Sequence, residues 1–198
     1  MSYDPIRGNN RLETLCQSLS TNFDPLAGIE NYKHDLTISK VSTYFYQRNM
    51  VFTKPMIQSY VRMGLLPPPL DGRDYVPEHL MILAMLHFLK KASSLEDVKS
   101  AFKLALEGPS GNVEMPRDSS SVKEIYNVFQ DIKQACEESL ARAMPDISLA
   151  LERLRPSLEF DAFSKKGEEC NFMHLMALMC LGSAVQRMQE SLIKEAIN

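Results

Sequence analysis

The sequence predicts an all-α protein with a small β-wing, and three observations lead to this fold class. Apolar residues recur every three or four positions over most of the chain, which is the period of amphipathic helices. Prolines and glycines interrupt this pattern at the points where helices must end. One short segment, 70–76, has the composition of a tight turn with a short strand on either side.

Composition along the chain predicts four regions. Residues 1–35 are expected to form an N-terminal arm with one short helix, and residues 36–107 a compact helical module that includes the wing. The segment 108–118, with its glycines and prolines, is the predicted linker. Residues 119–198 then form a helical C-terminal region, which is a candidate for dimerisation or effector binding.

Helix-end signals locate the helices of the central module. A first helix follows Thr37, and Thr53 caps the second because its hydroxyl can accept a free amide of the first turn. Gly64, followed by three prolines, ends this second helix. Pro77 begins a third helix that is apolar on most sides and therefore central to the core, and Ser94 caps a fourth.

Two longer helical stretches are expected in the C-terminal region. Apolar residues spaced by three and four predict a helix from Ser121, which Pro145 stops, and a shorter one that Pro156 ends. A long helix is expected over residues 168–196. Its apolar first half is interpreted as a buried segment, with methionines such as Met179 filling the core.

The charge of the chain is distributed unevenly. The formal net charge is only −3, so the molecule as a whole is not a basic coat for nucleic acid. Between Leu36 and Tyr75, however, basic residues outnumber acidic ones. The basic residues are Lys40, Arg48, Lys54, Arg62 and Arg73, and the acidic residues are only Asp71 and Asp74. A locally basic module on an acidic body directs an anionic partner to one surface.

The second helix of the module carries a polar stripe suited to DNA. Lys54, Gln58 and Arg62 are spaced by four residues and form one outward face. Lys54 and Arg62 can neutralise phosphates, and Gln58 can pair with an adenine edge. Arg73 on the wing can hold a phosphate to the side. The alternative interpretation, an ordinary solvated helix face, has the same spacing.

Three separated motifs, in order, resemble MerR-type transcriptional regulators. Residues 56–68 (MIQSYVRMGLLPP) look like their recognition helix, residues 72–75 (GRDY) like their wing, and residues 94–99 (SLEDVK) like the start of their fourth helix. The resemblance covers about half the chain and implies a winged helix-turn-helix that binds DNA. It adds Ser59 and Tyr75 to the DNA-binding residues.

A closer resemblance is to MerR-like proteins of unknown function from Gram-positive bacteria. They share the patterns of residues 53–61 (TKPMIQSYV) and 64–69 (GLLPPP), and they also have a helical C-terminal part. Typical MerR regulators have Arg and Tyr where this chain has Gln58 and Ser59, which weakens one expected backbone contact. The long dimerising coiled coil after the fourth helix is also missing, and the predicted linker and helical region stand in its place.

These observations favour a sequence-specific regulator of transcription that binds double-stranded DNA. We expect a homodimer, because one short helix in one groove gives modest affinity, and the helix over residues 168–196 is the candidate interface. One alternative is a protein–protein interaction module that keeps the winged fold without DNA binding. Another is a sensor whose C-terminal helices enclose an unknown small-molecule effector.

No enzyme motif, metal site or cofactor site is predicted. Cys170 and His174 share a helix face, a spacing that could hold a metal, but a buried thiol beside a helix histidine is the preferred interpretation. His87 is interpreted as a hydrogen-bonded core residue and His79 as a surface residue. Scattered cysteines and the lack of a signal peptide or membrane span favour a cytoplasmic protein.

Overall fold

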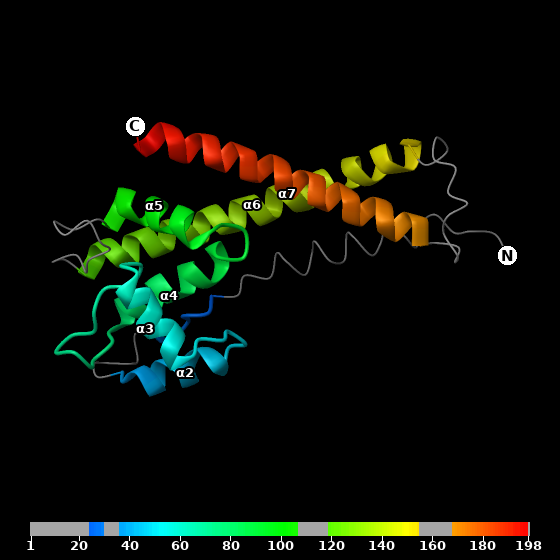
Figure 1. Ribbon diagram of the computed structural model, residues 1–198. Coiled ribbons are helices and arrows are strands. Elements are labelled where there is room, and N and C mark those ends of the chain that lie inside the picture. Colours follow the sequence, from blue (N-terminus) through cyan, green and yellow to red (C-terminus); the bar gives the residue numbers. More distant parts are fainter. Residues whose placement is uncertain (1–23, 30–35, 107–118, 155–167, 198) are drawn as a thin grey trace. The chain divides into compact units, whose positions relative to one another are not determined.

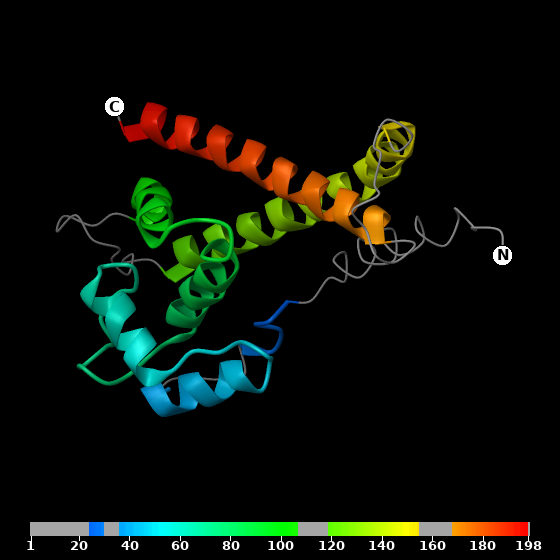
Figure 2. The same ribbon diagram turned by 45° about the vertical axis from the view of Figure 1, so that its right-hand side comes forward.

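The computed structural model describes residues 24–29, 36–106, 119–154 and 168–197 (Figures 1 and 2). These residues form six α-helices, in agreement with the predicted all-α class: α2 (Ile38–Tyr46), α3 (Lys54–Arg62), α4 (Pro77–Leu89), α5 (Leu95–Leu106), α6 (Ser119–Leu154) and α7 (Glu168–Ile197). The chain divides into two compact units, one built mainly from residues 23–130 and the other mainly from residues 131–191.

The predicted ends of the short helices are confirmed. The Thr53 hydroxyl accepts a hydrogen bond from the Met56 N–H at 3.3 Å, so the first turn of α3 is capped. Pro77 is the first residue of α4, where its missing N–H costs nothing. The Ser94 hydroxyl accepts the Asp97 N–H at 3.1 Å ahead of α5. Short-range chemistry therefore decides where each of these helices begins.

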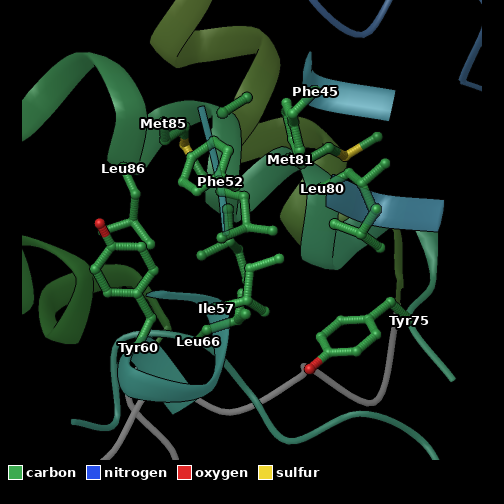
Figure 3. Close-up of a cluster of buried hydrophobic side chains, with 14 of the residues drawn as sticks. Phe45, Phe52, Ile57, Tyr60, Leu66, Tyr75, Leu80, Met81, Met85 and Leu86 are labelled. Atoms are coloured by element: carbon green, nitrogen blue, oxygen red, sulfur yellow. The ribbon is translucent and has the colours of Figure 1, made fainter. Parts of the chain in front are cut away.

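Helix α4 forms the centre of the larger unit. Every residue from His79 to Leu86 is buried, as expected for a helix that is apolar on most sides. Beside it, the Phe52 ring lies 4.8 Å from Phe45 and 6.4 Å from Tyr60 between ring centroids (Figure 3). The same core includes buried residues of the other elements: Leu26, Ile29, Val41, Ile57, Leu65, Val98, Phe102, Val122 and Tyr126.

Two tyrosines fasten the segment 24–29 to this unit. The Tyr126 hydroxyl donates to Asp24 Oδ1 at 2.7 Å, and the Tyr44 hydroxyl donates to the Pro25 carbonyl at 3.2 Å. The Leu26 N–H donates to the same Asp24 oxygen at 2.8 Å. The compact unit thus includes chain on both sides of the predicted central module. The predicted linker and most of the predicted arm lie outside the described residues.

The segment predicted as a β-wing is a tight turn closed by single bridges. Within the described part of the chain there is no β-strand, and the pairing is limited to Leu70 with Asp74 and Leu36 with Tyr75. Residues 67–69 are prolines, which have no N–H with which to extend a ladder before Leu70. On the other side α4 begins directly after Val76.

The position predicted for His79 is wrong, because its side chain is fully buried. Its Nδ1 accepts the Val76 N–H at 3.1 Å, so the neutral ring carries its hydrogen on Nε2 and donates it to the Pro68 carbonyl at 3.1 Å. The Tyr75 ring packs on it edge-on at 5.2 Å. Burial lowers the pKa of His79, which keeps the ring neutral. His79 therefore joins the start of α4 to the chain that follows α3.

Helix α6 does not stop at Pro145, contrary to the prediction. It runs from Ser119 to Leu154 with Pro145 inside it. Pro145 is exposed, and Met144 beside it is buried with Ala141 and Ile147 packed against it. Packing of helical residues on both sides of Pro145 offsets the lost hydrogen bond and the ring clash of an internal proline, which together cost about 3 kcal/mol.

The first half of α7 is not a buried segment, which corrects another prediction. Met173 is buried, but Met179 is 59% exposed, and several neighbouring apolar side chains are exposed with it. Apolar periodicity alone cannot tell a buried face from one that no other part of the subunit covers. None of the described helices is both long and apolar enough to cross a membrane.

We expect His79→Ala to lower the free energy of unfolding by about 2–4 kcal/mol, because it leaves a cavity and two unpaired backbone groups, the Val76 N–H and the Pro68 carbonyl. Urea denaturation measures the change. The exposed substitution Asn127→Ala is the control and should stay within about 0.5 kcal/mol of the wild type. If His79→Ala lowers the free energy of unfolding no more than this control does, the structural role that we assign to the His79 ring is contradicted.

The protonation of His87 should make the stability of the protein depend on pH. His87 is half-buried and its Nδ1 has no hydrogen-bond partner in the described structure, so the predicted hydrogen-bonded histidine is wrong. Burial, and then the charges of Lys91 and Lys90, lower the pKa of His87 to about 4. The unfolded chain therefore takes up a proton near pH 6.5, while the folded state resists it down to about pH 4.

Stability should consequently fall as the pH drops from about 6.5 to 4. His87→Leu should flatten this decline, because leucine fills similar space beside Phe52 and Phe88 and cannot titrate. Urea denaturation of both proteins at a series of pH values is the measurement. His79 also has a lowered pKa, so part of the slope should remain in the variant. An unchanged slope would contradict the assignment to His87.

Candidate nucleic-acid interface

Helix α3 presents one buried face and one polar exposed face. Ile57 and Tyr60 are buried in the core, while Lys54, Gln58 and Arg62 are all exposed. The three exposed residues are separated by four positions, so their side chains follow one another along the helix. The predicted outward stripe on α3 is therefore confirmed in its exposure.

The C-terminal end of α3 is fixed by a Schellman motif. Gly64 has φ +68°, a left-handed conformation that a residue with a side chain rarely adopts. Its N–H donates to the Val61 carbonyl at 3.0 Å, and the Leu65 N–H donates to the Tyr60 carbonyl at 2.9 Å. The chain turns away after Gly64, so Arg62 lies in the last turn of the helix.

Two lysines, one in α5 and one directly after α4, hold α3 in place. Lys99 of α5 donates from Nζ to the Met63 carbonyl at 2.6 Å, which satisfies a free acceptor at the end of α3. Lys90, which directly follows α4, donates to the Tyr60 hydroxyl at 3.3 Å. Neither lysine could be recognised from the sequence, because each contact joins residues that are far apart in the chain.

The turn after α3 places Arg73 on the surface. Asp71 and Gly72 have φ values of 50° and 75°, as the central residues of a type I′ turn require, and the Arg73 N–H donates to the Leu70 carbonyl at 3.1 Å. The Arg73 side chain is 80% exposed, and its Nε lies 3.5 Å from Asp74 Oδ2. The Asp74 side chain is only 17% exposed, so the contact is partly buried on the side of the acid, while the guanidinium itself stays open to solvent and to an external partner.

A pocket lies between α3, the start of α2 and this turn. We call it the α3 pocket; its volume is about 500 Å³. It is lined by Thr37, Ile38, Gln58, Val61, Arg62, Pro69, Gly72, Arg73 and Tyr75. The start of α2 reaches the pocket because Leu36 is bridged to Tyr75 by two backbone hydrogen bonds, of 3.3 and 2.9 Å. That pairing is long-range, so no local signal in the sequence marks Thr37 or Ile38.

The six residues predicted to bind DNA occupy four different environments. Gln58, Arg62 and Arg73 come together around the α3 pocket, and Lys54 lies on the same helix outside it. Ser59 is half-buried, and its hydroxyl contacts the Met63 sulfur at 3.8 Å. Tyr75, unlike the other five residues, is buried.

Tyr75 is only 3% exposed, so its ring belongs to the core and to the inner wall of the pocket (Figure 3). Burial raises the pKa of its hydroxyl, which keeps the phenol protonated. Its backbone holds Leu36, and its ring packs on His79. The geometry gives Tyr75 a positioning role beneath the surface that carries Arg73.

Positive charge on this surface is only partly neutralised. The first turn of α3 contains no acidic residue that would neutralise the charge of Lys54. Arg62 has no ion-pair partner among the described residues. Arg48, by contrast, lies 3.8 Å over the Tyr44 ring and donates to the Tyr44 carbonyl. The cations near the pocket, and not Arg48, are therefore the ones available to an external anion.

The described residues contain no cluster of three or more His, Cys, Asp or Glu side chains that could hold a metal. The side chains of Cys170 and His174, the pair that shares a helix face, lie outside this description. Cys136 and Cys180 are exposed free thiols.

Comparison with known proteins finds one similarity, which covers about half of the chain. Residues 33–129 match the model described as a domain of unknown function (DUF1836). This match extends from just before α2 into α6 and includes the whole α3 pocket. No curated protein and no solved structure matches the chain. Residues 33–129 are thus similar to a domain without an established biochemical role, whereas the relation to MerR regulators and to proteins of Gram-positive bacteria stays a prediction.

Proposed function

We propose that this protein binds double-stranded DNA through α3 and the 70–74 turn and regulates transcription in the manner of a MerR-like winged helix. The observation that carries the proposal is the shared surface of Gln58, Arg62 and Arg73, which places two cations beside an amide that can pair with a base edge. No enzyme motif is found in the sequence, and the described residues contain no cluster of metal-binding side chains.

The dimensions of α3 suit a DNA groove. An α-helix with its side chains is about 10–12 Å across, which matches the major groove width of about 12 Å, and the nine residues of α3 would extend about 14 Å along it. Lys54 and Arg62, at opposite ends of the exposed stripe, would each reach a phosphate, and Gln58 between them would face the base edges. Phosphate contacts fix the register of the helix, and the Gln58 contact supplies base preference.

The alternative is an interaction module that has kept this fold without binding DNA. Gln58 and Ser59 replace the Arg and Tyr of typical MerR helices, and this favours the alternative. The exposed Lys54 on the same stripe favours DNA, because protein interfaces are usually depleted in lysine, whereas the exposed Arg62 and Arg73 suit either kind of partner. Salt dependence and base preference separate the two functions.

We expect the affinity for a duplex selected from a random pool to fall steeply between about 50 and 200 mM salt. Arg62→Ala and Arg73→Ala should each weaken binding to every sequence and reduce the salt slope by about one, because each removes a phosphate contact. Gln58→Ala should instead lower discrimination at one base pair by about 1–3 kcal/mol. Fluorescence anisotropy with selected and scrambled duplexes measures both effects.

Lys123→Ala is the matched control, since Lys123 is an exposed cation on α6. It should bind like the wild type. Equal, weak binding of selected and scrambled duplexes, with Arg62→Ala and Arg73→Ala indistinguishable from Lys123→Ala, would favour the interaction module instead.

We propose further that the regulator is a homodimer joined through α7. The exposed side chains Leu178, Leu181, Val185, Met188 and Leu192 are spaced by three, four, three and four residues, which is the a and d spacing of a coiled coil. Their exposed fractions lie between 37% and 67%. A second copy supplies the same apolar seam, so pairing two α7 helices would cover both seams and present two α3 helices to two half-sites.

Val185→Glu combined with Met188→Glu should convert a dimer into a monomer, because it places two charges in the middle of the seam. Sedimentation equilibrium at micromolar concentration measures the mass. Ser183→Glu is the control, since Ser183 lies on the same helix off the seam and beside Arg187, with which it already hydrogen-bonds. A monomeric wild type, or a double variant that remains dimeric, would contradict the proposed interface.

A further inference from the structure

The α3 pocket has properties that DNA binding does not require. A helix that only grips phosphates needs an exposed cationic ridge, whereas here Gln58, Arg62 and Arg73 border a hollow of about 500 Å³. Apolar side chains form much of the rest of its lining: Ile38, Val61, Pro69 and Tyr75. This volume lies in the range of small-molecule sites, which are mainly apolar with a few placed polar groups.

The apolar walls and the polar rim of the pocket would contact different parts of one ligand. Ile38 and Val61 are half-buried and leave apolar surface exposed to water inside the pocket, which an apolar body would cover. Arg62 and Arg73 come from different elements and can both donate to an oxyanion in a forked geometry. Gln58 adds an amide that can either donate or accept.

We propose that the α3 pocket binds a small organic molecule with an oxyanion head, a carboxylate or a phosphate, on an apolar body. The head pairs with Arg62 and Arg73, and the body lies against Ile38, Val61 and Pro69. This site differs from the effector site expected among the C-terminal helices. It requires no movement of the core, because every lining residue belongs to the compact unit that α4 centres.

The ligand would compete directly with DNA, a consequence that rests on the proposed function. Gln58 and Arg62 belong both to the pocket and to the outward stripe, so one side chain cannot serve both partners at once. Lys54 belongs to the stripe but does not line the pocket. Substitution of Lys54 therefore separates the two activities.

Binding is tested first without DNA, on the full chain, with 2-naphthoate and 2-naphthyl phosphate as probes. Neutral 2-naphthamide and inorganic phosphate are the comparison compounds. We expect at least one naphthyl anion to bind about tenfold or more tightly than naphthamide and inorganic phosphate, because only it engages both arginines and the apolar walls. Isothermal titration calorimetry measures the affinities, and preference for one probe identifies the head group.

Arg62→Gln and Arg73→Gln should each weaken binding of the preferred probe by about tenfold or more, whereas Lys123→Gln should not. Two arginine variants are used so that an unfolded one does not decide the result; circular dichroism checks each fold. If inorganic phosphate binds as tightly as the naphthyl anions, or if the arginine variants bind like Lys123→Gln, the pocket is not a ligand site and the inference is overturned.

Competition is tested second, by adding the preferred probe to the protein–duplex complex. We expect displacement of the duplex at probe concentrations that fill the pocket. Lys54→Gln should lose DNA affinity and keep probe affinity, whereas Arg62→Gln should lose both. A probe that binds through Arg62 and Arg73 but leaves duplex affinity unchanged overturns the competition while the ligand site stands. A protein that binds the probe and no duplex overturns the proposed function alone.

Discussion

The burial of α4 on all sides determines how the other elements of the larger unit are arranged. A helix whose residues from His79 to Leu86 are all buried must be covered on every side, and the chain provides α2, α3, α5, the start of α6 and the segment 24–29 for this purpose. Because α3 packs against this core through Ile57 and Tyr60, its opposite face is exposed to solvent. The exposed stripe is thus a consequence of the core, and its chemistry is what selection can vary.

His79 connects this core to the site. Its ring is hydrogen-bonded to Pro68 on one side of the 70–74 turn and to Val76 on the other, and it supports the Tyr75 ring. Tyr75 in turn bridges to Leu36 at the start of α2. One buried neutral imidazole therefore ties together both ends of the turn that carries Arg73. A protonated ring could not accept the Val76 N–H, so the burial that lowers its pKa also protects this joint.

The features that the sequence predicted correctly are local. The Thr53 and Ser94 caps, the Pro77 start and the Gly64 stop each depend on a few neighbouring residues, and all four hold. The exposure of the α3 stripe follows from the same helical period that buries Ile57.

The features that the sequence missed depend on contacts between distant positions. The buried His79 needs Pro68, and the pocket needs Leu36 beside Tyr75. Periodicity predicted that residues 168–196 are helical but could not tell which apolar residues of α7 the rest of the subunit leaves uncovered.

The DNA site and the ligand site that we propose on the α3 surface depend on the same hydrogen-bond geometry. Arginine forks bind carboxylates and phosphates by the same geometry, so a surface that presents Arg62 and Arg73 around a hollow can take a free anion or a DNA phosphate with similar bonds. What differs is the rest of each partner. A duplex extends along α3 to Lys54, whereas a small ligand gains its additional affinity from the apolar walls beneath the arginines. For the two proposed partners, the balance would therefore depend on Lys54, which only the duplex would touch, and on the apolar walls, which only the ligand would touch.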